Sequence, residues 1–563
     1  MVQKLTKLFS GRWAIATVLT IFAIPAVLRL LLPGFYEPHD LHHFADIYQM
    51  FRAFSSGQIP PRWGPDFLYN FGYPLFNFYY VMPFYLGALF LAIGGSIQLS
   101  FKLIFVSSIL IGVAGMYFLL RQFTGKFAAV IGTLIFLYTP YRAVQIYVRG
   151  AIGEALSLAL LPLVAYVFIK VVKSEGKLRN IAAAGIVGAI FILSHNYMWV
   201  LSLPWIIVLA LLFAKRKNIW LSLKSLGLSA ILMLGVSAFW WVPAIVEQKL
   251  VAAQTPFPLI DHFPFIKQLI IPFWGHGPSI TGPYDGLSFQ IGIINLLGVF
   301  VAGIMILFFK KAFKDKKLYL VGAFTLASFF VTIFMMNIRS YPIWRIMPFH
   351  DFVQFPWRLL SFTTLFSAIL IAITVELWKK NFRIIFGLIL IAAAMFLTYN
   401  YFQPSGVFYK SDDQYLSRFF AYKNTVSQDY KNYSEDYLLL PRTSDEKPNS
   451  LPDEKITSIA GEVSDIKEIS PINWSASVSV AEETQVTYNT LSFPGWYASV
   501  DGNPVDIVPG KPYGQIEIKV PQGTHKVNFY WRETPLRRNL DLLSAASLLI
   551  SLIFVFRKPR ATL

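Results

Sequence analysis

The sequence predicts a mainly α-helical bundle of transmembrane segments that carries one β-sandwich-like domain outside the membrane. Hydrophobic residues make up 55% of the 563 residues and charged residues only 14%, whereas soluble domains carry about 25% charged residues. Apolar runs close to the ~20 residues that a membrane span requires recur along the whole chain. Near the C-terminus a stretch with period-two alternation, typical of β-strands, interrupts this pattern.

Thirteen apolar segments are candidates for membrane spans. Short basic clusters between them, such as Lys215–Lys217 and Arg557–Arg560, are typical of cytoplasmic loops. They account for much of the net charge of +18 without a nucleic-acid partner. Both termini then lie in the cytoplasm, so the number of crossings is even, and we expect about twelve. The segments are 13–32, 79–98, 101–120, 127–140, 151–172, 181–194, 198–214, 225–245, 289–309, 318–336, 359–378, 382–402 and 539–556.

One candidate must therefore fail to span. Segments 79–98 and 101–120 are the closest pair, and the first begins with the aromatic, proline-broken stretch Tyr79–Pro83. We expect one of these two, the first by preference, to be interfacial or re-entrant.

The predicted topology divides the chain into four parts. Alternation in Ser477–Val480 and Gln515–Val520, with turn signals such as Pro494-Gly495, predicts the antiparallel sandwich. The chain has no cysteine, which excludes disulfides, thiolate catalysis and cysteine-ligated zinc. The parts are the bundle (1–402, with an external loop at 33–80), a polar external linker (403–455), the β domain (456–538), and the final span with a basic cytoplasmic tail (539–563).

The first external loop holds the densest group of reactive side chains, in the run Glu37-Pro38-His39-Asp40-Leu41-His42-His43-Phe44-Ala45-Asp46. If residues 40–54 are helical, Asp40 and His43 share a face, and so do His42 and Asp46. Asp40 could then act as a general base, oriented by His39. His43 and Asp46 could hold a divalent cation. The alternative is an interfacial loop whose polar residues face lipid headgroups and water.

Several arginines fall in segments that the topology places outside, where basic residues are disfavoured. Since the planar guanidinium suits phosphate oxygens, we predict that they bind a lipid-linked phosphate. The alternatives are contact with anionic lipid or pairing with carboxylates such as Asp285. The predicted donor-binding arginines are Arg62, Arg142, Arg149 and Arg358.

Ionisable residues within or beside spans are costly and usually face a cavity or a partner. On this ground Glu154, His195 with Asn196, and Asp351 are predicted to support the site. Two alternatives remain open: Arg149 and Glu154 form a purely structural pair, or His195-Asn196 is a solvated turn. Phosphate-loop, nucleophile-elbow and His-Glu-x-x-His motifs are missing from the sequence.

Three stretches resemble the bacterial and archaeal membrane proteins labelled 6-pyruvoyl-tetrahydropterin synthase-related. They are Tyr138-Thr-Pro-Tyr-Arg142 through Arg149-Gly-Ala-Ile-Gly-Glu154, then Leu193-Ser-His195-Asn196, and Phe355-Pro-Trp-Arg358. His39-Asp40 also resembles the acidic first-loop position of GT-C glycosyltransferases, polytopic enzymes that use polyprenyl-phosphate-linked sugars. The resemblance implies a GT-C-like bundle with Asp40 as the catalytic acid-base residue. Histidines stand here where many GT-C enzymes carry a second carboxylate.

The function implied is the transfer of a sugar from a polyprenyl-phosphate donor to an extracytoplasmic glycan, lipid or protein acceptor at the cell membrane. Membrane lipids, the lipid-linked donor and the acceptor are the expected partners, and a divalent metal ion is the one candidate cofactor. Two other functions remain as alternatives: a flippase or exporter of lipid-linked oligosaccharides, and a non-catalytic membrane assembly protein.

Overall fold

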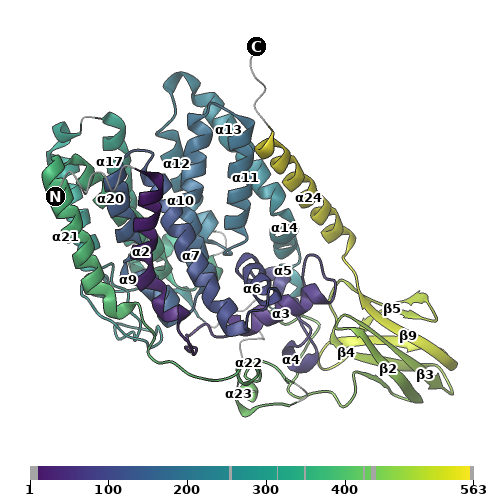
Figure 1. Ribbon diagram of the computed structural model, residues 1–563. Coiled ribbons are helices and arrows are strands. Elements are labelled where there is room, and N and C mark those ends of the chain that lie inside the picture. Colours follow the sequence, from purple (N-terminus) through teal and green to yellow (C-terminus); the bar gives the residue numbers. More distant parts are fainter. Residues whose placement is uncertain are drawn as a thin grey trace.

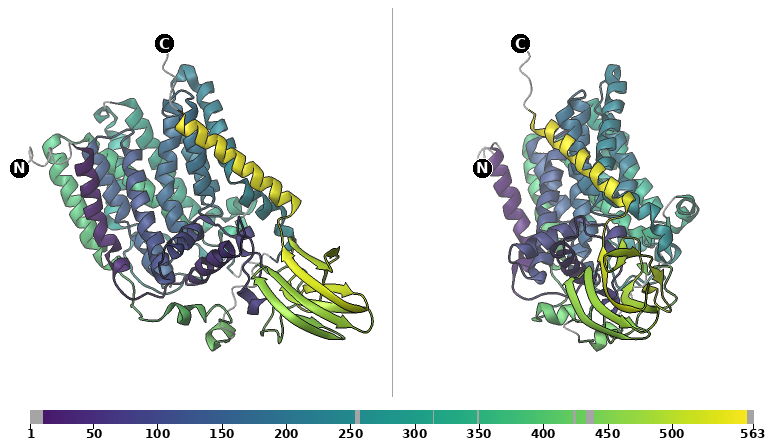
Figure 2. Two further views of the ribbon diagram at one scale, coloured as in Figure 1. Left: turned by 45° about the vertical axis from the view of Figure 1, so that its right-hand side comes forward. Right: turned by 90° about the vertical axis from the view of Figure 1, so that its right-hand side faces the viewer.

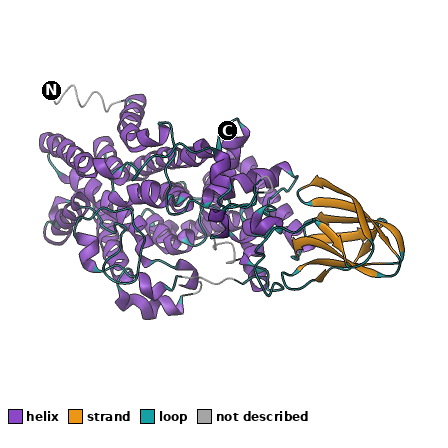
Figure 3. Ribbon diagram, turned by 90° about the horizontal axis from the view of Figure 1, so that it is seen from below, coloured by secondary structure: helices purple, strands orange, loops and turns teal. Residues whose placement is uncertain are grey.

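The computed structural model describes residues 11–252, 257–313, 315–347, 350–422, 425–432 and 439–557, without the side chains of Arg12, Asp351, Phe352 and Lys380. The chain forms an elongated helical bundle with a β domain attached at one end (Figures 1 and 3). Most long helices stand side by side, while short helices and loops gather at the end that carries the β domain. The molecule is thus mainly helical with a C-terminal β domain, as predicted.

Eight of the described helices are long and apolar enough to cross a membrane. A ninth span results if α8 (Lys126–Leu137) is joined to Pro140–Arg149, from which it is bent by 49°. The eight are α2 (Arg12–Leu31), α7 (Ile97–Leu120), α10 (Ile152–Lys173), α13 (Ile219–Val236), α17 (Lys316–Met335), α20 (Leu360–Leu377), α21 (Lys380–Thr398) and α24 (Pro535–Phe556).

Four shorter apolar helices decide the number of crossings: α6 (Met82–Ala92), α11 (Leu178–Ile192), α12 (Met198–Leu211) and α16 (Ile293–Phe308). With 11 residues, α6 is about 16 Å long, roughly half of the hydrocarbon thickness. Helix α6 lies in segment 79–98, which we expect to be interfacial or re-entrant rather than to cross the membrane. The other three have 14 to 16 residues. Twelve crossings therefore require that all three span, together with the bent pair.

Close packing in the bundle depends on small residues where helices touch. On α7, a Cβ added at Gly115 would lie 3.0 Å from the backbone nitrogen of Leu163 in α10, and one at Gly112 would lie 3.3 Å from the Cα of Ala159. Helix α20 is buried almost all round, between α8, α16 and α17. A helix that is apolar and buried on every side belongs at the centre of a bundle.

The β domain is a sandwich of two antiparallel sheets. The first sheet has the order β1-β4-β8-β7 and the second β2-β3-β9-β5-β6. Tyr488 of β4 and Phe529 of β9 stack across the interior with ring centroids 4.8 Å apart. The strands are β1 (Ile456–Ser458), β2 (Glu462–Ser470), β3 (Asn473–Val480), β4 (Thr484–Leu491), β5 (Trp496–Val500), β6 (Asn503–Val505), β7 (Val508–Pro509), β8 (Gln515–Val520) and β9 (Gly523–Trp531).

The sandwich packs directly on the first loop of the bundle. The Trp63 ring lies 5.3 Å from that of Trp531 and 5.6 Å from that of Trp496, and Leu491 donates its backbone N–H to Phe71 O. Helices α3 (His43–Ser55), α4 (Phe67–Asn70) and α5 (Leu75–Phe78) therefore lie between the spans and the β domain (Figure 2). Shorter helices complete the chain: α9 (Pro140–Ala143), α14 (Ala238–Val246), α15 (Ile266–Ile270), α18 (Tyr341–Ile346), α19 (His350–Val353), α22 (Asp412–Leu416) and α23 (Gln428–Lys431).

Candidate active site

The loop after α2 runs beside a π-helical turn, η1 (Val144–Arg149), at the end of the bundle that carries the β domain. The backbone N–H of Asp40 donates to Arg149 O at 2.7 Å, and that of His39 donates to Val148 O at 3.1 Å. Gly150 ends the turn in the left-handed region, and a Cβ there would lie 2.5 Å from Pro38 Cγ. Such π turns occur frequently at functional sites. Helix α3 begins only at residue 43, so Asp40 precedes the helix that was predicted to contain it.

Glu154 is the centre of a buried polar cluster. Its Oε1 accepts hydrogen bonds from the Tyr141 hydroxyl at 2.5 Å, Gln145 Nε2 at 3.1 Å and Ser361 Oγ at 3.2 Å. Its Oε2 is bonded to Arg149 Nη1 and lies 3.8 Å from Arg358 Nε. A buried carboxylate is stable only with such compensation. The predicted Arg149–Glu154 pair is therefore present, within a larger network.

Arg149 links this buried cluster to Asp40. Its Nη2 lies 3.4 Å from Asp40 Oδ2, and its guanidinium lies 4.8 Å from the ring centroid of Trp357. The Asp40 side chain is 27% exposed, whereas that of Glu154 is 1% exposed. Burial raises the pKa of Asp40, but the charges of Arg149, His43, His42 and Arg358 together outweigh it and lower the pKa below its usual value. Asp40 is thus an ionised carboxylate that a substrate can reach.

Arg358, in the turn before α20, brings a second positive charge to the cluster. Its Nη1 donates to the Tyr197 hydroxyl at 2.6 Å, and its guanidinium lies 4.8 Å from the Phe355 ring centroid. Among the described residues its Nε has no hydrogen-bond acceptor, and Glu154 Oε2 is too distant to serve as one. Two arginines thus share one buried carboxylate, and Asp40 faces outward beside them.

His195 is buried, so the alternative of a solvated turn is wrong. Its ring stacks on Tyr80 at 5.4 Å and meets the Tyr197 ring edge-on at 4.6 Å. Burial, and next the charge of Arg358, lower the pKa of His195 to about 3, so the imidazole is neutral at physiological pH. Asn196 Nδ2 donates to Phe78 O at 3.3 Å and so ties this turn to the first loop.

His42, His43 and Asp46 form the group best suited to a metal ion among the described residues, with one donor atom from each within 4.8 Å of the others. Two imidazoles and a carboxylate suit Zn²⁺ or a similar transition metal. His43 Nδ1 lies 3.2 Å from Asp46 Oδ2, and its Nε2 lies 3.1 Å from the Tyr80 hydroxyl. A metal would have to replace one of these contacts. His39 lies apart from the group, with its Nε2 2.9 Å from His276 O.

Arg62 and Arg142 do not join the site. The guanidinium of Arg62 is paired with Asp541 at 2.9 Å and Glu533 at 3.4 Å, at the junction between the loop, β9 and α24. A donor-binding role for Arg62 therefore does not fit the structure. Arg142 is 1% exposed and lies over the Phe136 ring, away from solvent. The side chain of Asp351 lies outside the described part of the chain.

Five residues that complete the cluster were not predicted from the sequence: Tyr141, Gln145, Tyr197, Trp357 and Ser361. Trp357 Nε1 donates to Ser279 Oγ at 3.2 Å, which brings the loop before α16 over the site. Tyr141 and Trp357 stand directly before Arg142 and Arg358 in the motifs already singled out. Both aromatic residues are thus part of motifs identified in the sequence, but only the arginines were predicted to belong to the site, because they are charged.

Residues 76–405 match the family described as 6-pyruvoyl-tetrahydropterin synthase related domain, a membrane-protein family. An uncharacterised protein of Lactococcus lactis subsp. cremoris is 25% identical over 247 residues, which cover 41% of this chain and 39% of the relative. The match thus spans about two fifths of that relative's length.

Two solved structures align with much of the chain at low identity. The arabinofuranosyltransferase AftD from mycobacteria aligns over 71% of this chain and 28% of its own, with 14% identity and a TM-score of 0.47. The oligosaccharyltransferase of Archaeoglobus fulgidus aligns over 79% of this chain and 61% of its own, with 15% identity and a TM-score of 0.44. The activities in these names are those of the two proteins themselves.

Proposed function

We propose that this chain, which belongs to the membrane-protein family described as 6-pyruvoyl-tetrahydropterin synthase related, is a GT-C-like glycosyltransferase. The donor would be a sugar linked to a polyprenyl phosphate, and the acceptor an extracytoplasmic glycan, lipid or protein. One observation carries the proposal: an ionised, partly exposed carboxylate, Asp40, lies against two arginines that share a single buried carboxylate. A carboxylate that could act as a general base thus lies beside guanidinium groups that suit phosphate oxygens.

In the proposed reaction Asp40 accepts the proton of the acceptor hydroxyl. The acceptor oxygen forms a bond to the anomeric carbon while the bond from that carbon to the phosphate oxygen breaks, with inversion. Arg149 and Arg358 stabilise the negative charge that develops on the departing lipid phosphate. Glu154 and Trp357 act as positioning residues, because both contact Arg149 and hold its guanidinium towards Asp40.

A divalent ion at His42, His43 and Asp46 would supply further positive charge for the leaving phosphate. The three side chains lie in the turn and first residues of α3, directly after Asp40. Metal dependence is therefore part of the proposal, and chelation followed by re-addition of Zn²⁺ or Mn²⁺ tests it.

The site and the β domain share one end of the bundle (Figure 2). We place this end outside the cell membrane, with both chain termini in the cytoplasm, because the basic clusters of the sequence mark the opposite ends of the helices. A polyprenyl-phosphate donor presented at the outer leaflet would then reach Arg358 and Arg149 from the lipid phase.

The test is transfer by the purified protein in detergent, with a radiolabelled polyprenyl-phosphate sugar and membrane glycan extract as acceptor. The variant Asp40→Asn should lose about 10²–10⁴-fold in rate, while Glu37→Gln, three residues away and bound to Lys410 and Arg418, should keep it. Equal rates for both variants would contradict the proposal.

The same assay separates the two alternatives. A flippase needs a membrane to move lipid across and yields no product in detergent, and an assembly protein releases no lipid phosphate. If the wild-type protein folds, binds the donor and forms no product with any acceptor fraction, the exporter or assembly function replaces the transferase.

A further inference from the structure

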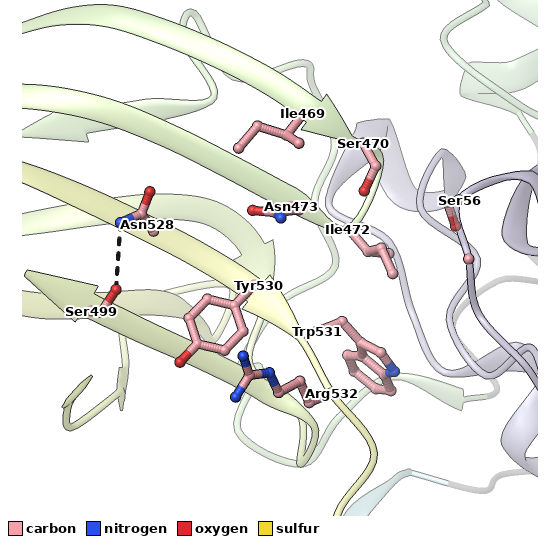
Figure 4. Close-up of a pocket in the computed structure, with 11 residues that line it drawn as sticks. Ser56, Ile469, Ser470, Ile472, Asn473, Ser499, Asn528, Tyr530, Trp531 and Arg532 are labelled. Atoms are coloured by element: carbon pink, nitrogen blue, oxygen red, sulfur yellow. Dashed lines mark hydrogen bonds between the residues drawn. The ribbon is translucent and has the colours of Figure 1, made fainter. Parts of the chain in front are cut away.

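An open groove of about 460 Å³ lies where the β domain meets the end of α3 (Figure 4). One wall is Ser56-Gly57, directly after α3, and the other is the end of the five-stranded sheet. Figure 4 shows Asn473, Asn528, Tyr530 and Arg532 on the sheet side of this space. The volume is in the range of small-molecule sites, and the Trp63 cluster that joins β domain to bundle lies behind it.

Where the outward face of this sheet borders the groove, its side chains are mainly hydroxyl, amide and tyrosine groups, whereas Lys526 and Glu462 lie on the same face farther along the strands. Strand pairing places Asn473 opposite Tyr530, and Tyr530 opposite Tyr497, in one row. The next row on the same face is Lys467, Ser475, Asn528 and Ser499. Asn528 Nδ2 reaches Ser499 Oγ at 3.5 Å.

Aromatic faces lie beside these polar groups. The rings of Tyr530 and Tyr497 stack at 6.0 Å, with planes only 17° apart, and Arg532 covers Tyr530 at 4.8 Å. Hydroxyls and amides can each donate and accept hydrogen bonds, while a tyrosine offers a flat apolar surface with a polar edge. A sugar ring has the complementary chemistry, since it carries many hydroxyl groups around an apolar C–H face.

The groove and the candidate active site lie at opposite ends of one helix. His43 begins α3 beside Asp40, and Ser55 ends it beside the groove. The 13 residues of α3 give a separation of about 20 Å. A ligand that reaches from one to the other is a chain of several sugars.

We propose that this groove binds an oligosaccharide chain, and that it holds the distal part of the acceptor while the growing end reaches Asp40. The assignment of the chain as acceptor rests on the proposed function; the binding of a saccharide does not. Tyr530 contacts a sugar ring beside Arg532, and Asn473, Asn528 and Arg532 bind the hydroxyl groups of that sugar.

The experiment measures binding of fluorescently labelled oligosaccharides of four to six units to the full-length protein in detergent. The panel comprises glucose, mannose, galactose, rhamnose and arabinose oligomers, with a labelled peptide of similar size. At least one oligomer should bind, and Tyr530→Ala should weaken that binding at least tenfold. The matched control Thr524→Ala, on the same face at the far end of β9, should leave it unchanged.

The variant Asp40→Asn separates this proposal from the proposed function. It should bind the oligosaccharide as the wild type does, even if it transfers no sugar. Saccharide binding without any transferase activity would overturn the transferase function and leave the groove assignment standing. Three results would overturn the groove assignment. They are binding of the peptide but of no oligosaccharide, binding of no ligand in the panel, and an affinity of Tyr530→Ala for the oligosaccharide equal to that of the wild type.

Discussion

Two buried arginine–glutamate pairs lie at the same end of the molecule and differ in what surrounds them. At the domain junction Arg537 donates to both oxygens of Glu247, at 2.8–3.1 Å, and Asn77 adds a bond at 2.7 Å. At the site two arginines approach Glu154, and Arg149 also reaches outward to Asp40. The junction pairs one cation with one carboxylate away from solvent. The site keeps positive charge and one carboxylate within reach of a ligand.

This difference separates an ion pair that holds the two domains together from one that lies beside the carboxylate of the proposed reaction. Removing one partner of a buried pair leaves an uncompensated charge and costs about 3–5 kcal/mol. Within the described residues Glu247 accepts every hydrogen bond that the Arg537 side chain makes, whereas Asp40 remains beside Arg149 when Glu154 is changed. The two pairs therefore predict different consequences for the same substitution.

The largest effect is expected for Glu247→Gln. This variant should lower the free energy of unfolding by about 3–5 kcal/mol, seen as a reduced midpoint of thermal unfolding in detergent. The folded fraction should keep its rate of sugar transfer, because Glu247 does not contact the Asp40 cluster. A midpoint of thermal unfolding equal to that of the wild type would show that the domain junction does not depend on the Glu247–Arg537 pair.

Glu154→Gln should have a smaller effect on stability and a clear effect on activity. The amide still accepts the bonds of Tyr141 and Ser361, and Asp40 still faces Arg149, so we expect a loss of about 1–3 kcal/mol. The transfer rate should fall more than tenfold, since Arg149 loses the group that orients it. Equal stability losses in Glu154→Gln and Glu247→Gln would remove the distinction between the pairs.

Arg358→Lys tests the role of the second arginine that approaches Glu154. Lysine keeps the charge but not the planar fork that binds two phosphate oxygens. The KM for the lipid-linked donor should rise about tenfold, which corresponds to about 1.4 kcal/mol, with a smaller change in kcat. A lower kcat at unchanged KM would instead assign Arg358 to the transition state alone.

A pH dependence of stability is expected from Lys455, which makes a second contact between the first loop and the sandwich. Its Nζ donates to Asn70 O at 2.6 Å and Asn489 O at 2.9 Å, and burial lowers its pKa to about 7. Between this pKa and that of the unfolded chain, the unfolded state binds more protons. Stability should therefore rise with pH from about 7 to 10, by at most about 1.4 kcal/mol per pH unit. Lys455→Met should remove this rise, and an unchanged slope would contradict it.

Much of the fold could be predicted because hydropathy and strand alternation are local properties. The long apolar runs, the antiparallel sandwich and the short α6 all follow from such patterns. The number of crossings is harder to predict from the sequence. Helices α11, α12 and α16 are shorter than an isolated span requires, and the apolar runs that contain them extend beyond the helices into turns.

The candidate site could be predicted only where its residues are close in the sequence. Asp40, Arg149 and Glu154 were singled out by charge next to apolar runs. Ser361 lies 207 residues from Glu154 and reaches it only where α20 packs on α9. Arg62 resembled the other arginines in sequence, and only the partners Glu533 and Asp541 separate it from them.

The junction pair also has a consequence for how the protein is made. Glu247 and Arg537 are 290 residues apart, so at about 5–20 residues per second synthesis takes roughly 15–60 s to deliver the second after the first. Helix α24, which packs on α11, α13 and α14, follows the whole sandwich in the chain. During this interval the nascent chain exposes a carboxylate and an uncovered flank of the bundle. Biogenesis of this protein thus includes an interval in which one flank of the bundle is complete except for α24.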